Sequence, residues 1–200
     1  QYKAHYGDKA YSVHSKASVI AYPIIFMRAA QASASAGGAT AGIYLVMEGP
    51  TEADMRALAE EAYDDLTARL AAVGYEILPG SDAAQHPKFA ELERHVGNAH
   101  WASGTPDPYG KRVWFMVSSN RAPLLQKLDS WNGRFQFGLL PKLKEASREL
   151  GAMFVMPTLV LDFSSLGAVA GSGSQGSTAW AGGRVQIMVK ASSGAYMWSG

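Results

Sequence analysis

The chain has 200 residues, of which 48% are hydrophobic and 18% charged, and its formal net charge is +1. This length is typical of one domain, and so many hydrophobic residues exclude a disordered tail. A near-neutral charge is not typical of a nucleic-acid binder, so we expect no nucleic-acid partner. Because cysteine is absent, a disulfide scaffold, thiol catalysis, a Cys-ligated zinc ion and a lipid-anchored amino-terminal cysteine are excluded.

The start of the chain bears on where the protein works. Gln1 is not followed by a positively charged segment leading into an apolar one. This fits either a mature chain whose signal peptide has been removed or an artificially chosen first residue. The longest apolar run, Val19 to Met27, is interrupted by Pro23 and is far shorter than the ~20 residues of a membrane-spanning helix, so no membrane span is expected. Together with the cysteine-free, Ser-, Gly- and Ala-rich composition, these observations favour a periplasmic or extracellular location.

Strands and small-residue segments alternate in the first quarter of the chain. Residues 1–16 are polar and we expect them to be flexible, whereas the apolar, β-branched residues 17–28 predict a strand. Pro23 removes one ladder donor and so suggests an edge position or a bulge. Residues 29–42 are almost entirely Ala, Ser, Gly, Gln and Thr, which indicates a mobile loop. A short buried strand is expected at residues 43–47.

The clearest helix is predicted from Thr51 to Val73. Thr51 and Asp54 resemble a capping box, apolar residues recur at helical spacing, and Gly74 is typical of a helix end. The other face is acidic, which we interpret as a solvated face and only secondarily as a docking surface for a basic partner. Its residues are Glu60, Glu61, Asp64 and Asp65.

The remaining chain alternates predicted helices and strands and ends in a predicted hairpin. Loops are expected at 98–112 and, as a flexible excursion, at 164–183, because both are rich in Gly, Pro, Ser or Ala. The pattern indicates an α/β (α+β) domain over residues 1–200, a three-layer-like mixed sheet with about three helices and a C-terminal β-hairpin. The predicted helices are 87–96, a short one at 124–131, and 139–150, and the predicted strands are 75–78, 113–117, 152–163, 185–189 and 195–198.

Two motifs that could carry chemistry have simpler interpretations. Gly171, Gly173 and Gly176 spell G-x-G-x-x-G, but a dinucleotide site needs a strand-to-helix turn, and here another strand is predicted to follow. Glu91 and His95 lie four residues apart on one predicted helix, which fits a helix-face pair better than a metal site with three or four converging ligands. We therefore expect no cofactor, no metal and no catalytic residue, with a metal-dependent or serine hydrolase as the least favoured alternative.

Aromatic residues in the predicted loops give the main indication of binding. Aromatic rings in loops supply stacking area for ligands or contact area for protein partners, although they can also simply cover the edge of a core. We take the candidate ligand- or partner-binding residues to be His100, Trp101, Asp107, Tyr109, Trp131 and Arg134.

Three segments, taken in order, resemble a known group of envelope proteins. They are the helix-to-strand unit Tyr63 to Leu78, the unit Leu150 to Phe163, and the closing segment Val185 to Ser199. This order is similar to that in the periplasmic domain of curli-secretion-channel-type lipoproteins and in the amino-terminal domain of the Tol–Pal β-propeller protein. In those families a helix feeds a G-Y-x-V strand, a later helix ends in L-G-A-x-x-V, and a T-G-x-x-x-W-S hairpin closes the sheet.

The resemblance covers about half of the chain and has clear departures. The lipid-attachment cysteine is absent, Ser193 stands where the hairpin threonine would be, and residues 29–42, 98–112 and 164–183 are insertions. The resemblance implies an envelope-located domain for assembly or interaction, without an enzyme site and without a pore.

Two functions of different classes are therefore expected. The first is a non-enzymatic extracytoplasmic domain that acts in assembly through contacts with a protein partner or with itself. The alternative is a small-molecule or glycan-binding module that uses the loop aromatics.

Overall fold

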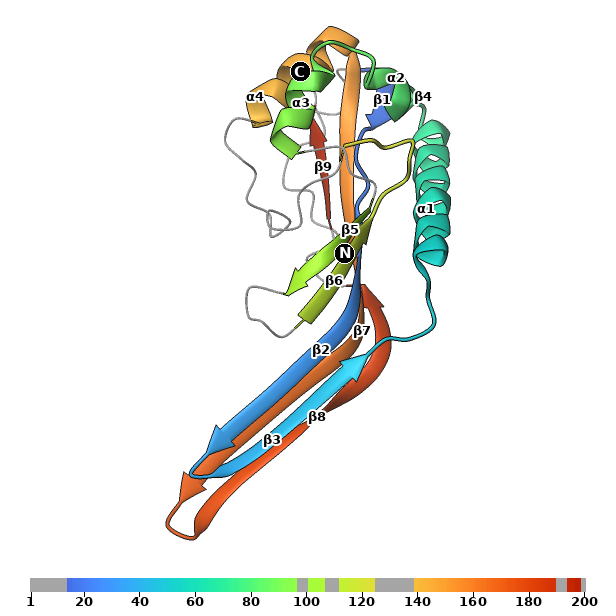
Figure 1. Ribbon diagram of the computed structural model, residues 1–200. Coiled ribbons are helices and arrows are strands. Elements are labelled where there is room, and N and C mark those ends of the chain that lie inside the picture. The colour runs from blue at the N-terminus through green and yellow to red at the C-terminus, as the bar shows by residue number, and fades with distance from the viewer. Residues whose placement is uncertain (1–13, 97–100, 107–111, 125–138, 190–193, 199–200) are drawn as a thin grey trace.

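The computed structural model describes residues 14–96, 101–106, 112–124, 139–189 and 194–198, which form a mixed α+β body and a long arm of two β-hairpins (Figure 1). The strands are β1 (Lys16–Val19), β2 (Ile24–Ala36), β3 (Ala39–Val46), β4 (Glu76–Ile77), β5 (Trp101–Pro106), β6 (Arg112–Val117), β7 (Ala152–Gly173), β8 (Gly176–Val189) and β9 (Gly194–Trp198). The helices are α1 (Glu52–Ala72), α2 (Gly80–Ala83), α3 (Phe89–Val96) and α4 (Leu139–Leu150). None of these helices is both long enough and apolar enough to cross a membrane, among the residues just given.

One mixed sheet connects all nine described strands. Its main path runs β4-β1-β7-β2-β6-β5, while β3 pairs with β2, and both β8 and β9 pair with β7. The long strand β7 pairs in parallel with β1 and then with β2, so it runs from the body into the arm. Irregularities in register lie where the arm leaves the body, between Met27 and Ala29 in the β2–β6 pairing and between Asp162 and Ser164 in the β7–β8 pairing.

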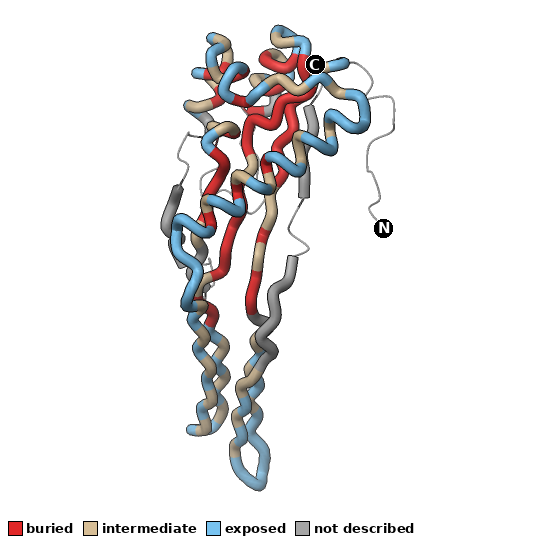
Figure 2. Tube along the Cα trace, turned by 90° about the vertical axis from the view of Figure 1, so that its right-hand side faces the viewer, coloured by how far each residue is buried: buried red, intermediate tan, exposed pale blue. Residues whose placement is uncertain are grey.

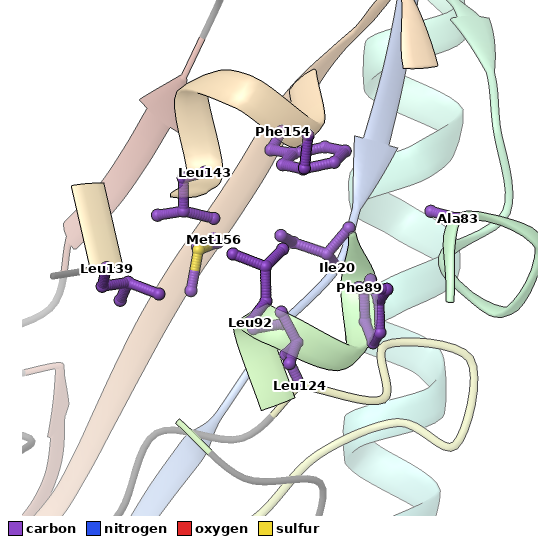
Figure 3. Close-up of a cluster of buried hydrophobic side chains, with 11 residues drawn as sticks. Ile20, Ala83, Phe89, Leu92, Leu124, Leu139, Leu143, Phe154 and Met156 are labelled. Carbon is purple, nitrogen blue, oxygen red and sulfur yellow. The ribbon is translucent and has the colours of Figure 1, made fainter. Parts of the chain in front are cut away.

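Helices cover both faces of the body sheet, which confirms the three-layer α+β prediction. On one face Val19 and Val155 pack with Tyr63 of α1. On the other face Phe154 and Met156 form a cluster with residues of α3 and α4 (Figure 3). Because successive strand residues point to opposite faces, the continuous apolar run of β7 serves both layers. Burial is concentrated in this body, whereas the arm is intermediate or exposed (Figure 2).

Helix α1 begins and ends where the sequence predicts. The Thr51 hydroxyl accepts from the amide of Asp54 at 3.2 Å, and the Asp54 carboxylate accepts from the amide of Thr51 at 2.8 Å, which completes a capping box. Gly74 has φ 100 just beyond the helix, a conformation that favours glycine. The predicted helices at 87–96 and 139–150 are also confirmed, as α3 and α4.

Several predicted loops are strands instead. Residues 29–42 belong to β2, a two-residue turn and β3, and residues 164–183 belong to β7, a turn and β8. Within the predicted loop 98–112, residues 101–106 form β5. The strand at 43–47 is longer than expected and only half-buried in alternation, because it forms part of a hairpin in the arm.

Two other details differ from the expectation. The predicted strand 17–28 is divided into β1 and β2, and Pro23 precedes β2, which there lies between β7 and β6 and not at an edge. The C-terminal hairpin is formed by β7 and β8. Strand β9 pairs with another part of β7 and not with β8. The flexible segment expected at 1–16 lies largely outside the described residues, which begin at His14. The short helix expected at 124–131 also lies outside them, except for Leu124.

Candidate functional site: the two-hairpin arm and the cavity at its base

The first hairpin of the arm joins β2 and β3. The strands pair from Ala29–Val46 to Ala36–Ala39, which leaves Gly37 and Gly38 as a two-residue turn with φ 52 and 88. A tight hairpin turn whose two central residues both have positive φ matches the twist of the strands, and glycine adopts that conformation without strain. Two adjacent glycines therefore fix the position of this turn.

The second hairpin is longer and joins β7 and β8. Pairing continues from Leu161–Val189 to Gly173–Gly176, so the G-x-G-x-x-G glycines lie at the tip of an antiparallel hairpin. This is not the strand-to-helix turn that a dinucleotide requires. The motif therefore serves the turn, and Gly176 has φ 126 there.

The two hairpins lie side by side and form a thin two-layer arm (Figure 2). Along each strand every second residue is half-buried, and the inner positions are mostly alanine. Leu45 of β3 and Leu166 of β7 join one apolar cluster at the base, which identifies these alternating residues as the inner faces. At the tip, a Cβ at Gly37 would collide with the hydroxyl of Ser177. The half-buried residues at inner positions beyond the base are Ala32, Ala34, Ala36, Ala39, Ala41, Ile43, Ala168, Ala170, Ser177, Ala179 and Ala181.

The outer surface of the arm is uncharged and carries exposed apolar side chains. Neither 29–46 nor 164–183 contains a charged residue or a proline. Tyr44 is 62% exposed on β3, and on the other hairpin Val169 and Trp180 are 67% and 62% exposed. Val169 and Trp180 are directly opposite each other in the β7–β8 ladder, so they stand side by side on one face.

Strands β3 and β8 each have an edge without a partner strand among the described pairings. β3 pairs only with β2, and β8 pairs only with β7. An unpaired edge presents a row of amide and carbonyl groups that can pair with another chain, and native proteins usually protect such an edge with lysine, proline or a covering element. The arm has neither of these residues along the two segments.

A cavity of about 270 Å³ lies at the base of the arm. Its wall is almost entirely apolar and comes from the start of β2, the middle of β7, the β3–α1 connection and the first turns of α1. Two carboxylates reach the wall, but Asp54 is engaged in the α1 cap and Asp162 is only 1% exposed. The lining residues are Phe26, Met27, Met47, Pro50, Asp54, Met55, Leu58, Leu161, Asp162 and Phe163.

A polar network fixes α1, which forms one side of this cavity. The Arg121 guanidinium donates to Asp64 at 2.7 Å and to Glu60 at 3.1 Å, and it lies 4.5 Å from the centre of the Tyr63 ring. Glu60 also accepts from the Ser119 hydroxyl at 2.7 Å and from the amide of Asn120 at 2.8 Å. The helix is therefore held to the segment that follows β6 by charge-assisted hydrogen bonds.

The same contacts change the protonation of their groups. Burial acts to raise the pKa of Glu60, but the hydrogen bonds from Ser119, Asn120 and Arg121 outweigh it and hold that pKa below its usual range. The hydrogen bond from Arg121 lowers the pKa of Asp64. Hydrogen bonding to Asp64, supported by Glu60, raises the pKa of Arg121. All three groups are therefore charged at neutral pH.

The binding residues predicted from the sequence lie mostly outside the described residues. Of His100, Trp101, Asp107, Tyr109, Trp131 and Arg134, the structure describes only Trp101, which begins β5. Their proposed role in binding stays a prediction.

The pairing of Glu91 with His95 stays a prediction, because the side chain of His95 lies outside what the structure describes. Glu91 of α3 forms ion pairs with Lys88, at 3.5 Å, and with Lys142 of α4. Its carboxylate therefore joins two helices. Over the described ranges, no group of three or more His, Asp or Glu side chains could hold a metal ion.

Sequence reasoning missed the arm, although a signal for it was present. Ala36-Gly37-Gly38-Ala39 is a hairpin turn sequence, and alanine recurs at every second position on both sides of it. Alanine alternates there with serine, glutamine, threonine and glycine. Because alanine is only weakly hydrophobic, the alternation produces little contrast in hydrophobicity.

Comparisons with known proteins found no similarity that bears on the site. No family model, no curated protein and no solved structure matches the chain.

Proposed function

We infer that the protein is a non-enzymatic domain that acts in assembly, and that its arm makes the contact with a protein partner or with further copies of the chain. The observation that carries this proposal is the pair of unprotected edges on β3 and β8, in an arm that extends well beyond the body (Figure 1). Adding a strand to such an edge satisfies backbone hydrogen bonds on both chains, and it requires no preformed pocket.

The composition of the arm supports association. A long, uncharged edge without proline is an aggregation hazard for a protein that works alone. Such a sequence is more consistent with an arm whose edges are covered in the working assembly. The exposed Tyr44, Val169 and Trp180 add apolar area of the kind that is enriched at the centres of interfaces.

The location proposed for this assembly is the periplasm or the extracellular space. The support is the cysteine-free composition and the resemblance to envelope domains. We expect an assembly domain of this kind to need neither a cofactor nor a metal.

Charged substitutions on the two edge strands test the proposal. Gly42→Lys in β3 and Thr178→Lys in β8 each place a lysine at an exposed position, and a Cβ at Gly42 meets neighbouring atoms at no less than 3.6 Å. We expect each substitution to weaken association at least about tenfold, because edge lysines oppose strand addition. Sedimentation velocity of the purified chain over a range of concentrations measures this.

Ala57→Lys is the matched control, because it adds the same charge to an exposed position of α1. It should leave association unchanged. If the edge variants associate as strongly as the control, or if the unmodified chain is monomeric at every concentration and captures no partner strand, then the arm is not an assembly surface.

A further inference from the structure

The cavity at the base of the arm has the size and polarity of a pocket for an aromatic side chain. A dry cavity of about 150 Å³ binds benzene, so a volume of about 270 Å³ can hold a two-ring indole. Met47, Met55 and Leu58 line the pocket, and flexible methionine side chains adapt to an inserted ring. Of the two carboxylates in the wall, Asp54 accepts hydrogen bonds from Thr51 and Asp162 is buried, so the surface open to an occupant is mostly apolar.

The arm carries an apolar pair of matching size and polarity. Val169 and Trp180 face outward together, and three of their four neighbours on that surface, Gly167, Gly171 and Gly182, have no side chains, while the fourth is Thr178. The pair therefore lies on a surface that is mostly glycine. The indole of Trp180 lies against Gly182, where a Cβ would stand only 2.5 Å from the ring. A ring already held in one place loses less conformational freedom when it is bound.

The pair cannot occupy the cavity of its own chain. Val169 lies eight residues beyond Leu161, which lines the cavity, and β7 is paired with β8 along this whole interval. At about 3.3 Å per residue the separation is roughly 25 Å. Only another copy of the chain can bring this pair to the pocket without breaking the ladder.

We propose that the cavity at the base of the arm of one copy receives the Val169–Trp180 pair of a second copy. This inference rests on the proposed assembly function, to which it adds the identity of the partner and the anchor. The Val169–Trp180 pair carries no charge, and the pocket wall is apolar apart from Asp54 and Asp162, so apolar surface makes up most of the contact. Because the pair and the pocket are different parts of one chain, each copy can donate to one neighbour and accept from another, which is a heterologous contact.

Two variants remove opposite halves of this contact. Trp180→Ala removes the donor and leaves the pocket intact. Leu58→Lys places a charge at the mouth of the pocket, on an exposed helix position that tolerates lysine, and leaves the donor intact. We expect each variant alone to raise the dissociation constant by about thirtyfold, which is typical of the loss of a hot-spot residue. Val73→Ala, which trims another exposed apolar side chain at the C-cap of α1, is the control and should have no effect.

The decisive experiment mixes the two variants. A 1:1 mixture still contains one intact pair and one intact pocket, so we expect sedimentation velocity to show a heterodimer that neither variant forms alone. If the mixture stays monomeric while the unmodified chain assembles, the contact is not heterologous and the inference is wrong. It is also wrong if Leu58→Lys abolishes binding of the probe anilinonaphthalene sulfonate but leaves self-association unchanged, since the pocket would then serve a small molecule.

These outcomes are separable from those of the proposed function. If the edge variants Gly42→Lys and Thr178→Lys dissociate the assembly whereas Trp180→Ala and Leu58→Lys do not, the arm is an assembly surface. The insertion of the Val169–Trp180 pair into the cavity is then disproved. If none of the four affects association, both proposals fail.

Discussion

Replacing Gly37 by alanine places a methyl group where the tips of the two hairpins meet. The new Cβ would collide with the Ser177 hydroxyl and approach the Cβ of Ser172 to 3.3 Å. Gly37 also has φ 52, a conformation that costs an alanine about 1–2 kcal/mol. The substitution therefore adds a steric cost between the layers to a backbone cost within the turn.

Gly38 separates these two costs. It has φ 88, and a Cβ there would meet no atom within 4 Å. Gly38→Ala should therefore cost only the backbone strain of about 1–2 kcal/mol. Overpacking typically adds about 1–3 kcal/mol, so we expect Gly37→Ala to cost about 2–5 kcal/mol in total. The difference between the two variants measures the contact between the hairpins.

Hydrogen exchange of the arm amides is the appropriate assay, because a thin arm can open without unfolding of the body. Gly37→Ala should accelerate exchange in β2, β3 and β8 more than Gly38→Ala does. Adding Ser177→Gly to Gly37→Ala should remove most of the excess, because it deletes both the hydroxyl and the Cβ that the methyl group meets. Equal acceleration by Gly37→Ala and Gly38→Ala, with no rescue by Ser177→Gly, would falsify the two-layer packing of the arm.

Arg121 and Thr51 permit further predictions about the body. Arg121→Gln should reduce the free energy of unfolding by about 1 kcal/mol, since partly exposed ion pairs and a cation–π contact each contribute little; denaturant unfolding measures this. The pKa values of Glu60 and Asp64 are lowered in the folded state. Their contribution to the free energy of unfolding is therefore complete above roughly pH 5, and it is lost as the pH falls through the lowered pKa values. Arg121→Gln should therefore flatten the acid limb of the stability profile, and an unchanged limb would contradict the network. Thr51→Ala should cost about 1 kcal/mol by removing the α1 cap, and a loss below about 0.3 kcal/mol in the same unfolding assay would contradict that role.

The body of the protein could be predicted because its signals are local and strong. Thr51 and Asp54 mark the start of α1 and Gly74 its end, through hydrogen bonds and backbone conformation that depend on few neighbours. The apolar run from Ala152 to Phe163 predicts a buried strand whatever its partners are. Both features are nearly independent of the rest of the fold.

The arm could not be predicted from local signals, because its strands depend on one another. Glycine and, to a lesser degree, alanine have low strand propensity, so residues such as Ala32 and Ala34 form strands only when a second hairpin covers them. Small inner residues let the two layers approach closely. This packing explains why 29–42 and 164–183 are rich in Ala, Ser and Gly, a composition that is also typical of loops. The cavity was also beyond sequence reasoning, since Met47, Met55 and Phe163 are brought together only by the tertiary fold.

The register irregularity at the base of β2 decides which way the arm faces. Met27 is opposite Trp114 and Ala29 is opposite Val113, so Arg28 is an extra residue in the ladder. Each strand residue points to the side opposite its neighbour, and one extra residue therefore reverses the parity of everything that follows. Met27 and Ala30 are three residues apart and yet share one apolar cluster; regular pairing without the bulge would instead turn the alanines of β2 toward solvent and its glutamine and serines toward the second hairpin. A single residue at the base thus sets the orientation of the whole first hairpin.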